Sequence, residues 1–457
     1  MTSPLAESGT SPYFIAAFMV GIVALVLAES NGVPRVMLIF PDFYQLIEQG
    51  CFLAGGAMLG SIPATGLMWL ARGERGKAKA SPRMSFALST VCFVWCTLTL
   101  AIPFVLPSSR GGLGPMSMAL MLWVNLWKIM DMCAGTSPPC VFDHPLNLFS
   151  HLTFLIEYKT TRARTAAMTR TASELRFMPR THSEAQQLET LQGASGSSGG
   201  GGGSGGSGSV LQEHAETADA PEMPAPGEWA ATAFELAKTL TLFFALASAS
   251  ELSPPAWLAA APKGAFVLEW LAKYSHVWYI YCFLKMACDA NSTVLLTLGY
   301  KPQVAFRNPL TASTSPTDFW SRRWNLLVRG LFHRTVFTPL RNRSFPAWVS
   351  ALSAFVVSGA FHEYAFAPAS HGAALGSLTV FFCVQAAACT GELLVRRLST
   401  KSRLLQAIDA NTPAWARVLL TSALLVPFSP LFMAPLKAHG TLTQMRHVML
   451  RVRLAAA

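Results

Sequence analysis

A histidine and a glutamate stand side by side in one of the most apolar stretches of the chain. The run Phe355-Val-Val-Ser-Gly-Ala-Phe-His-Glu-Tyr364 places His362 and Glu363 in a segment that is otherwise typical of a membrane helix. A polar group in hydrocarbon costs several kcal/mol unless it is satisfied, so such a residue is expected to have a function. A neutral imidazole can remove the proton from an alcohol and make its oxygen a nucleophile. His362 is therefore the candidate general base.

The sequence neighbours of His362 indicate how its ring could be held. Ser358 lies one helical turn earlier, at i−4, where it could hydrogen-bond to the ring. Glu363, as the next residue, faces another side of the helix and is expected to satisfy a neighbouring helix or to line a polar path. If the stretch 345–367 starts at the cytosolic face, His362 lies roughly 26 Å along the helix, well inside the bilayer. The alternative is a structural histidine, hydrogen-bonded between helices.

A second motif, Asp318-Phe-Trp-Ser-Arg-Arg-Trp-Asn325, lies upstream of the histidine. Together with Ser-Gly-x-x-His-Glu at 358–363, it resembles the wax synthase branch of the membrane-bound O-acyltransferases. The resemblance at residue level covers roughly 280–368, with Ser321 where the family pattern has Gly. It implies that His362 is the catalytic histidine and that Asn325 is its partner, donating to the thioester carbonyl or orienting the acceptor. Asn325 could also simply cap the helix expected at 326–340.

The same block holds two arginines and two tryptophans that would bind the acyl donor. Arginine binds phosphate bidentately, so Arg322 and Arg323 are candidates for the phosphates of coenzyme A, and Asp318 is expected to pair with one of them. Trp320 or Trp324 would line the acyl or pantetheine path. The alternative is that these residues anchor the chain at the lipid headgroups. The predicted substrate-binding residues are Asp318, Trp320, Arg322, Arg323, Trp324, Ser358 and Glu363.

Composition places the chain in a membrane. Of its 457 residues, 52% are hydrophobic and 13% are charged, whereas soluble domains carry about 25% charged residues. The net charge of +11 lies in short clusters between apolar runs, which is typical of cytosolic membrane loops and not of a nucleic-acid-binding surface. Most of the nine cysteines stand in apolar runs, so neither a disulfide framework nor a metal site is expected.

We expect an all-α, multi-pass transmembrane bundle of the membrane-bound O-acyltransferase type. A spanning helix needs roughly 20 apolar residues. About nine stretches qualify, namely 13–28, 51–70, 85–106, 114–132, 229–250, 264–288, 345–367, 374–395 and 413–436. Three further apolar stretches are interrupted by charge and are expected to be interfacial or re-entrant helices: 34–50, 141–157 and 326–340. A tenth short span at 326–340 is the alternative.

Residues 193–209 are almost wholly Gly and Ser, a composition typical of a flexible coil. With its flanks, 181–227 is expected to be a disordered cytosolic linker. It separates the N-terminal helices, within 1–180, from the C-terminal region that carries the motifs, within 228–457. We expect the two groups to form one membrane domain.

Basic residues set the expected orientation. Four clusters, at 72–83, 159–180, 301–343 and 396–403, fall on the same side of the expected helices, which is then the cytosolic side. Pro427, Pro430 and Pro435 could break the last span, so the side of the C-terminal tail stays open. The first twelve residues hold no Lys or Arg, so no cleaved signal is expected. By the resemblance, the expected location is the endoplasmic reticulum.

The predicted reaction joins a long-chain fatty alcohol to the acyl group of acyl-coenzyme A and gives a wax ester. Acyl-coenzyme A is a substrate here, and no cofactor or obligatory protein partner is expected. No nucleophile elbow appears, so direct attack by the alcohol is favoured over an acyl-enzyme. A sterol or diacylglycerol acyltransferase is the alternative within the same class, and a transporter or channel with a buried histidine is the alternative from another class.

Phenylalanines near His362 would line a narrow tunnel for the alcohol; the candidates are Phe355, Phe361, Phe366, Phe381 and Phe382. They could instead face lipid or pack helices. Two other histidines are expected to have no catalytic role. His276 lies beside Trp278 and Tyr279 in another expected span, and His333 lies in the amphipathic stretch.

Overall fold

A computed structural model describes residues 35–73, 86–106, 112–159 apart from positions 135, 136, 138, 143 and 155, 221–249, 262–438 and 440–455. The predicted span 13–28 and most of the predicted linker lie outside these residues. The last residues of that linker, 221–227, are described. Within them, the backbone of Glu222 hydrogen-bonds to the Lys159 carbonyl at 2.8 Å and to the Lys301 amide at 3.2 Å.

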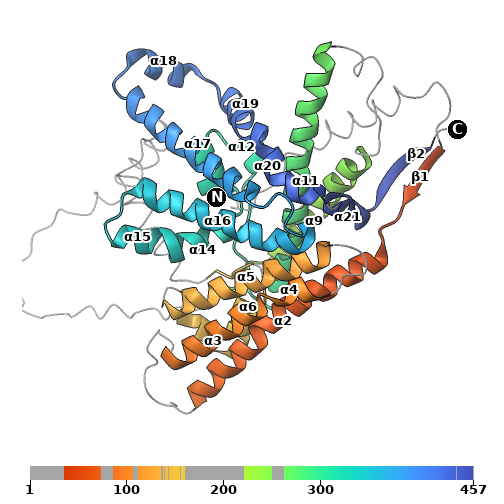
Figure 1. The fold of residues 1–457 in the computed structure, drawn as a ribbon, viewed down its shortest axis with the longest axis vertical. Helices are drawn as coiled ribbons and strands as arrows, with labels where there is room; N and C mark the ends of the chain where they lie inside the picture. The colour runs from red at the N-terminus through yellow and green to blue at the C-terminus, as the bar shows by residue number, and fades with distance from the viewer. Residues whose placement is uncertain are drawn as a thin grey trace, which may run out of the picture.

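The N-terminal helices form one packed group. Two of them, α2 and α5, lie against each other, and Gly56 permits the approach because a Cβ there would lie 3.0 Å from the Met118 carbonyl oxygen. α6 covers the end of this pair (Figure 1). The helices of the group are α2 (Phe43–Gly73), α3 (Phe86–Thr99), α4 (Ile102–Val105), α5 (Leu113–Cys133), η2 (Pro139–Phe142) and α6 (Pro145–Thr153).

The C-terminal group begins with a helical pair, α9 (Glu228–Ala249) and α11 (Pro262–Thr297). A second pair, α16 (Ala347–Ser370) and α17 (Ser377–Ser399), runs side by side across the molecule, and α5 packs beneath α16 (Figure 1). Short helices fill the chain between and after these pairs: α12 (Pro309–Ala312), α13 (Pro316–Asp318), η3 (Phe319–Arg323), α14 (Leu326–Phe332), η4 (His333–Phe337), α15 (Thr338–Asn342), α18 (Arg403–Asn411), α19 (Ala414–Leu425), η5 (Val426–Phe428), α20 (Ser429–Ala438) and α21 (Thr441–His447).

The described structure is mostly helical, as predicted, and it also contains two short strands. β1 (Arg35–Ile39) pairs antiparallel with β2 (Arg451–Ala455), with Arg35 opposite Ala455 (Figure 1). The stretch 34–50 was expected to be one interfacial helix, and it is instead a strand followed by the start of α2. Its five strand residues, Arg-Val-Met-Leu-Ile, include two β-branched residues, Val36 and Ile39. Their partner strand is more than 400 positions away in the sequence. No local pattern indicates such a pairing.

The structure does not confirm the prediction of about nine membrane spans. Among the described residues, four stretches are long and apolar enough to cross a membrane, judged by length and composition: Phe43–Leu67, Glu228–Ala249, Ser377–Ser399 and Ala414–Ala438. The other expected spans that are described are helical as well, in α3 with α4, α5, α11 and α16. The last span is interrupted at η5, where Pro427 lies.

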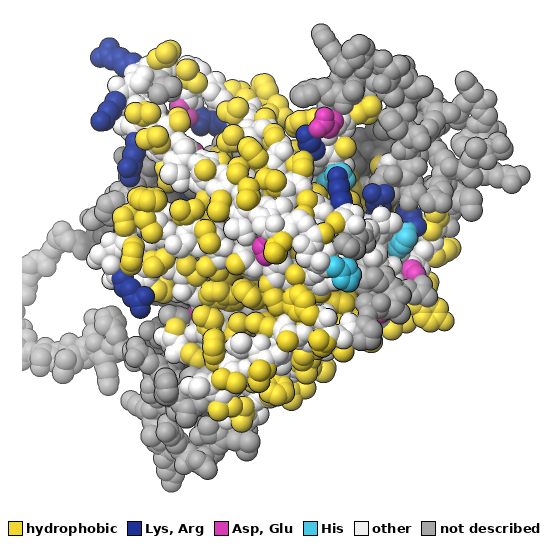
Figure 2. Space-filling view, in the orientation of Figure 1, with side chains coloured by type: hydrophobic (Ala, Val, Ile, Leu, Met, Phe, Trp, Pro, Cys, Tyr) yellow, Lys and Arg dark blue, Asp and Glu magenta, His cyan; other side chains and the backbone are white. Residues whose placement is uncertain are grey.

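The surface is that of an integral membrane protein. Figure 2 shows a face that hydrophobic side chains cover almost completely, with Lys and Arg gathered at two opposite edges, near α15, α17 and α18 on one side and near α21 on the other. Large apolar side chains on α3 and α19 are exposed, among them Leu98 and Leu420. An apolar band between two charged rims matches the layering of a bilayer.

A buried ionic network joins the two helical groups. Arg334, in the π-helix η4, places Nε 2.9 Å from Asp131 Oδ2 and a terminal nitrogen 2.7 Å from Glu157 Oε1. Burial tends to raise the pKa of Glu157, but the charge of Arg334 and those of His151 and Lys128 outweigh it and lower the pKa to about 2. The segment 326–340, predicted to be interfacial, therefore has one face fixed to the N-terminal helices.

Candidate functional site

The Ser-Gly-x-x-His-Glu motif joins α16 to α17. A Cβ on Gly359 would lie 2.8 Å from Thr379 Cα, so only glycine permits this approach. Glu363 Oε1 accepts hydrogen bonds from the backbone amides of Leu378 at 2.9 Å and Thr379 at 3.0 Å. These amides belong to the first turn of α17, where a negative charge is favourable. Of the two roles expected for Glu363, the structure shows the first, satisfying a neighbouring helix.

A backbone hydrogen bond fixes the tautomer of His362. Its Nδ1 lies 2.7 Å from the carbonyl oxygen of Ser358, one turn earlier in α16. A carbonyl oxygen can only accept, so Nδ1 carries the proton and Nε2 keeps a free lone pair. The expected contact with Ser358 thus exists, through the backbone and not through the hydroxyl. The ring is therefore arranged to accept a proton at Nε2.

Aromatic rings surround His362. Phe382 of α17 lies 4.6 Å from it between ring centroids, Phe432 of α20 lies at 5.5 Å and Phe366 at 5.9 Å. No charged side chain among the described residues forms an ion pair or a hydrogen bond with this ring, and the ring is only half-buried. We name the set of rings Phe366, Phe382 and Phe432 the aromatic chamber. It gives the basic nitrogen apolar surroundings.

The phenylalanines predicted to line a tunnel divide into three sets. Phe366 and Phe382 border the aromatic chamber, while Phe355 and Phe381 lie 5.8 and 6.3 Å from the Trp320 ring. Phe361 packs on its outer side against other helices, with Trp123 at 6.0 Å and Phe332 at 6.3 Å. Sequence reasoning missed Phe432, because it lies about 70 positions after His362 on a helix that meets α16 only in space.

The upstream block lies along α17 and reaches the chamber through Trp320. The amide of Thr317 donates to Glu392 Oε2 at 2.7 Å, nearer the end of α17. Trp320 Nε1 donates to Gln385 Oε1 at 3.3 Å, and the Trp320 ring lies 5.8 Å from Phe382. The five residues of η3 adopt a π-helical turn, a form that often marks functional sites. The two motifs are therefore brought together on either side of α17.

The two arginines of the block differ in their surroundings. Arg323 Nε lies 2.7 Å from Asp318 Oδ2, which confirms the expected pairing, and another Arg323 nitrogen donates to the Arg307 carbonyl at 3.2 Å. Asp318 Oδ2 also accepts from the Thr314 amide at 3.1 Å. Arg323 therefore holds the loop in place, whereas Arg322 is exposed. The structure does not test whether either arginine binds a substrate.

Asn325 caps α14. Its backbone has a positive φ of 38°, and its Oδ1 accepts from the Val328 amide at 3.4 Å. This is the capping role that its position before 326–340 allowed. Next to it, Trp324 stacks on Phe319 at 5.2 Å and lies 5.5 Å from Phe306. Because Asn325 Oδ1 accepts from the Val328 amide, only the side-chain nitrogen of Asn325 is available for a catalytic role.

Sequence reasoning also missed Gln385. Its side chain is 1% exposed, its Oε1 accepts from Trp320, and its Nε2 is buried with no hydrogen-bond partner among the described residues. Gln385 lies one turn of α17 after Phe382, on the same face. Leaving a buried donor unpaired costs about 1–3 kcal/mol, so such a group in a native protein points to an absent partner.

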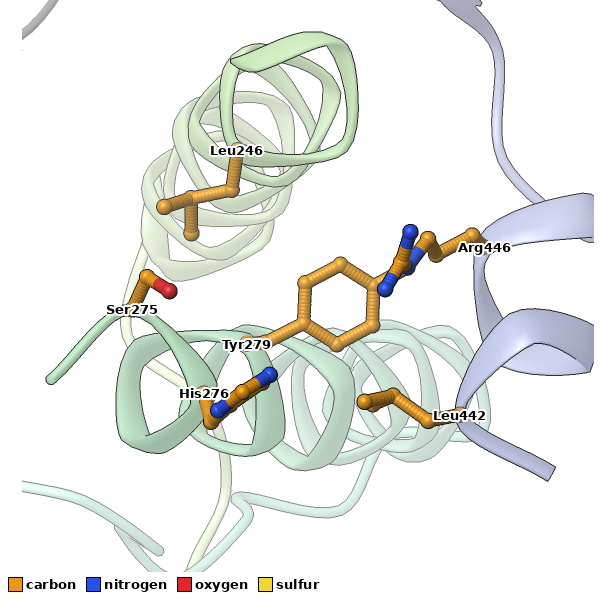
Figure 3. A pocket seen from close by; sticks show the side chains of 6 residues that line it. All are labelled: Leu246, Ser275, His276, Tyr279, Leu442 and Arg446. Carbon is orange, nitrogen blue, oxygen red and sulfur yellow. The ribbon is translucent and has the colours of Figure 1, made fainter. Parts of the chain in front are cut away.

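A separate cavity lies around His276, away from His362. This cavity of about 50 Å³ is partly open and is lined by side chains of α9, α11 and α21, and none of the predicted site residues borders it. Figure 3 shows the His276 ring and the Arg446 guanidinium on either side of Tyr279. His333, also predicted to be non-catalytic, stacks on Phe337 at 5.0 Å within η4. Neither histidine adjoins the aromatic chamber.

Comparison with known proteins shows what this region of the chain is similar to. Residues 302–384 match the model of the membrane bound O-acyl transferase family. The chain is 30% identical over 162 residues to probable long-chain-alcohol O-fatty-acyltransferase 3 of Arabidopsis thaliana, covering 34% of this chain and 46% of that protein. It is also 30% identical over 176 residues to the long-chain-alcohol O-fatty-acyltransferase of Simmondsia chinensis, covering 35% of this chain and 47% of that protein.

A third relative has a different name. Acyl-CoA–sterol O-acyltransferase 1 of Arabidopsis thaliana is 34% identical over 97 residues, covering 20% of this chain and 27% of that protein. The matches to these three relatives span less than half of their length. The matched region 302–384 holds the Asp318–Asn325 block, Ser358, His362 and Glu363. The resemblance inferred from those motifs is confirmed: residues 302–384 are similar to the membrane bound O-acyl transferase family, and the relatives include long-chain-alcohol O-fatty-acyltransferases.

Proposed function

We propose that this protein esterifies a long-chain fatty alcohol with the acyl group of an acyl-coenzyme A and so makes a wax ester. One observation carries the proposal: Ser358 engages Nδ1 of His362, which leaves Nε2 as a base in a chamber walled by aromatic rings. The relatives named long-chain-alcohol O-fatty-acyltransferases support the choice of substrates.

His362 moves one proton in each direction during the reaction. Its Nε2 takes the proton of the alcohol hydroxyl while the alcohol oxygen attacks the carbonyl carbon of the thioester. The tetrahedral intermediate then collapses, the carbon–sulfur bond breaks, and the coenzyme A thiolate takes the proton from the imidazolium. The products are the ester and free coenzyme A, and His362 is neutral again. Holding both substrates in one chamber removes much of the entropic barrier.

Negative charge that develops on the thioester oxygen needs a donor. Gln385 Nε2 is a buried donor without a partner in the described structure, held from its other end by Trp320. Asn325, assigned by the family resemblance, would contribute through its amide nitrogen. Removing one preorganised donor of this kind costs about 3–4 kcal/mol in the transition state. We assign Gln385 as the better placed of the two because it shares a helix face with Phe382.

A linear alcohol is the favoured acceptor, because two relatives are named long-chain-alcohol O-fatty-acyltransferases. Four phenylalanine rings lie within 6 Å of His362 and make its surroundings apolar, which suits an alkyl chain. A sterol acceptor is the second candidate, because one relative is named a sterol O-acyltransferase. One methylene too many or too few in an apolar pocket changes the barrier by about 1–3 kcal/mol, so acceptor preference should be sharp.

The test uses microsomes from cells that express the full chain and lack their own wax ester synthesis. Labelled palmitoyl-coenzyme A is supplied with saturated alcohols of graded length, with cholesterol and with diacylglycerol in parallel. We expect wax esters to form fastest, and Gln385→Leu to lower kcat by about 100-fold. Gln385→Glu, which keeps the size and loses the donor when ionised, separates the hydrogen bond from packing.

The outcomes test the substrate assignment and the enzyme assignment separately. Faster esterification of cholesterol or diacylglycerol than of any linear alcohol would refute the substrate assignment and leave the acyltransferase assignment standing. If the protein inserts normally and transfers an acyl group to none of the acceptors, the assignment as an acyltransferase is refuted.

A further inference from the structure

The cavity around His276 has the size and the donors of a site for a small anionic group. It is lined by Leu246 of α9, Ser275, His276 and Tyr279 of α11, and Leu442 and Arg446 of α21. In Figure 3 the His276 ring and the Arg446 guanidinium lie on two sides of the Tyr279 ring. The cavity measures about 50 Å³. One water needs about 10–15 Å³, so there is room for about four atoms of that size, which is the size of a phosphate group.

The positive charge beside this cavity is not neutralised by the part of the chain that the structure describes. Arg446 is half-buried, Lys437 at the end of α20 is exposed, and the charges of both act on the His276 ring. Within the described ranges, no carboxylate forms an ion pair with either cation. Arg334, by contrast, has two carboxylate partners. Cations that are left unpaired beside a cavity favour an anion inside it, and an arginine can bind phosphate through two N–H groups.

The length of α11 places the cavity at the level of lipid headgroups. The part of α11 from His276 to its last residue, Thr297, rises about 32 Å, close to the roughly 30 Å of a hydrocarbon core. The chain after Thr297 enters the basic stretch 301–343, which is expected to be cytosolic. His276 therefore lies about one hydrocarbon thickness away from the cytosolic side.

The turns of α11 that precede His276 are charged and exposed. Lys273 Nζ lies 2.7 Å from Glu269 Oε1, and 64% of the Glu269 side chain is exposed. Hydrocarbon does not accommodate an exposed ion pair, whereas the headgroup layer does. The membrane-crossing part of α11 therefore starts near His276, later than the expected start of this span at residue 264.

The neighbouring start of α2 has the composition of a membrane interface. Phe40, Phe43 and Tyr44 are 64%, 60% and 74% exposed. The Asp42 amide donates to the His447 carbonyl at 2.8 Å, which joins this segment to α21. Exposed aromatic rings next to basic residues are typical of the headgroup layer. Figure 2 shows the basic side chains near α21 at the edge opposite that of α17 and α18, so the cavity lies on the side away from the expected cytosolic face.

We propose that this cavity binds the phosphate of an anionic phospholipid in the leaflet away from the expected cytosolic side. Arg446 and Lys437 supply the charge, the His276 ring supplies a further donor, and the lipid chains extend past Leu246 and Leu442 along the apolar surface. A lipid phosphate is favoured over free phosphate because the cavity lies at headgroup level. It is favoured over coenzyme A because the cavity lies away from the cytosol. The site is separate from the aromatic chamber, and the inference does not rest on the proposed function.

The binding test uses the purified full chain in a neutral detergent and measures its melting temperature. Dioleoylphosphatidylglycerol should raise the melting temperature with increasing concentration. Dioleoylglycerol, which has the same chains and no phosphate, should not. Arg446→Gln should weaken binding of the phospholipid about tenfold or more, the value of a charge-assisted hydrogen bond. Arg397→Gln, which changes an exposed arginine in the last turn of α17 at the opposite edge, is the matched control and should bind like the wild type.

A second variant keeps the test decisive if Arg446→Gln folds poorly. Lys437 is exposed, so Lys437→Gln should fold normally and weaken the same phospholipid about threefold. Native mass spectrometry of the protein should show one retained phospholipid, and less of it in both variants.

Three results would overturn the inference. Stabilisation by dioleoylglycerol equal to that by the phospholipid, or a phospholipid effect unchanged in both variants, would remove the site. Stabilisation by inorganic phosphate as strong as that by the lipid, and lost in Arg446→Gln, would assign the cavity to a free anion. Stabilisation by coenzyme A through Arg446 would assign it to a nucleotide and place it on the cytosolic side.

Discussion

His362 and Lys285 are both titratable side chains on long helices of the C-terminal group, and their surroundings differ in kind. Lys285 has Asp289 at 2.6 Å and Glu235 at 3.8 Å. His362 has one backbone carbonyl at Nδ1 and aromatic rings elsewhere. A charge in a low-dielectric site must be paired, whereas a neutral ring can stay unpaired and reactive. The comparison separates a charge that its neighbours neutralise from a neutral ring that we propose accepts a proton.

The largest effect should come from removing the proton acceptor. His362→Ala should lower ester formation by about 1,000-fold or more, because general base catalysis of this kind contributes 10²–10⁴-fold. The melting temperature of the purified variant should stay close to that of the wild type, since no charge is left unpaired. His276→Ala, in the separate cavity, is the matched control and should keep its activity. Turnover by a well-folded His362→Ala protein would end the assignment.

Removing the charge at the other site should act on stability first. Lys285→Met leaves Asp289 buried without its cation, which costs about 3–5 kcal/mol, whereas Glu235 keeps Lys238. A lower melting temperature and a smaller yield of folded protein are expected. Lys285→Met with Asp289→Leu should recover most of the stability. Equal stability of the single variant and the wild type would contradict the ion-pair interpretation.

Two substitutions of Glu363 should affect both stability and activity, to different degrees. Glu363→Gln keeps an oxygen that can accept from Leu378 and Thr379 but loses the charge at the start of α17, at a cost of about 1 kcal/mol. Glu363→Ala loses both hydrogen bonds and should cost about 1–3 kcal/mol more. Activity should fall in the same order, because α17 carries Phe382. If Glu363→Gln lost all activity at wild-type stability, Glu363 would touch a substrate.

The smallest effect should follow deletion of the Gly/Ser run. Without residues 193–209, ester formation should stay within about threefold of the wild type, because that composition cannot form a packed element. Initial rates in microsomes, normalised to inserted protein, measure this. A large loss of rate at normal insertion would show that the run does more than connect.

The sequence predicted what depends on local pattern. Hydrophobic runs predicted helices that contain His276 and His362, and charge adjacency predicted the Asp318–Arg323 pair. The contact between Ser358 and His362 followed from helical spacing, although the atom that makes it, the carbonyl oxygen, did not. These are interactions between residues within one turn or one loop of each other.

Features that depend on helices meeting in space were missed. Gln385 and Phe432 reach the site only because α17 and α20 pack on α16. Nothing in the spacing of Gln385 distinguishes it from a polar residue on any other apolar helix. The β1–β2 pair and the role of Arg334 are further cases, because their partners lie hundreds of positions away. A single sequence carries no signal for such contacts.

The link made by Arg334 also concerns assembly. Its ion pairs with Asp131 and Glu157, the stacking of Trp123 on Tyr364 at 4.9 Å, and the hydrogen bond from Tyr364 to the Leu100 carbonyl at 2.9 Å all join residues before the Gly/Ser run to residues after it. These contacts need no covalent connection. A chain cut within 193–209 and produced as two co-inserted polypeptides should therefore reassemble into one working unit.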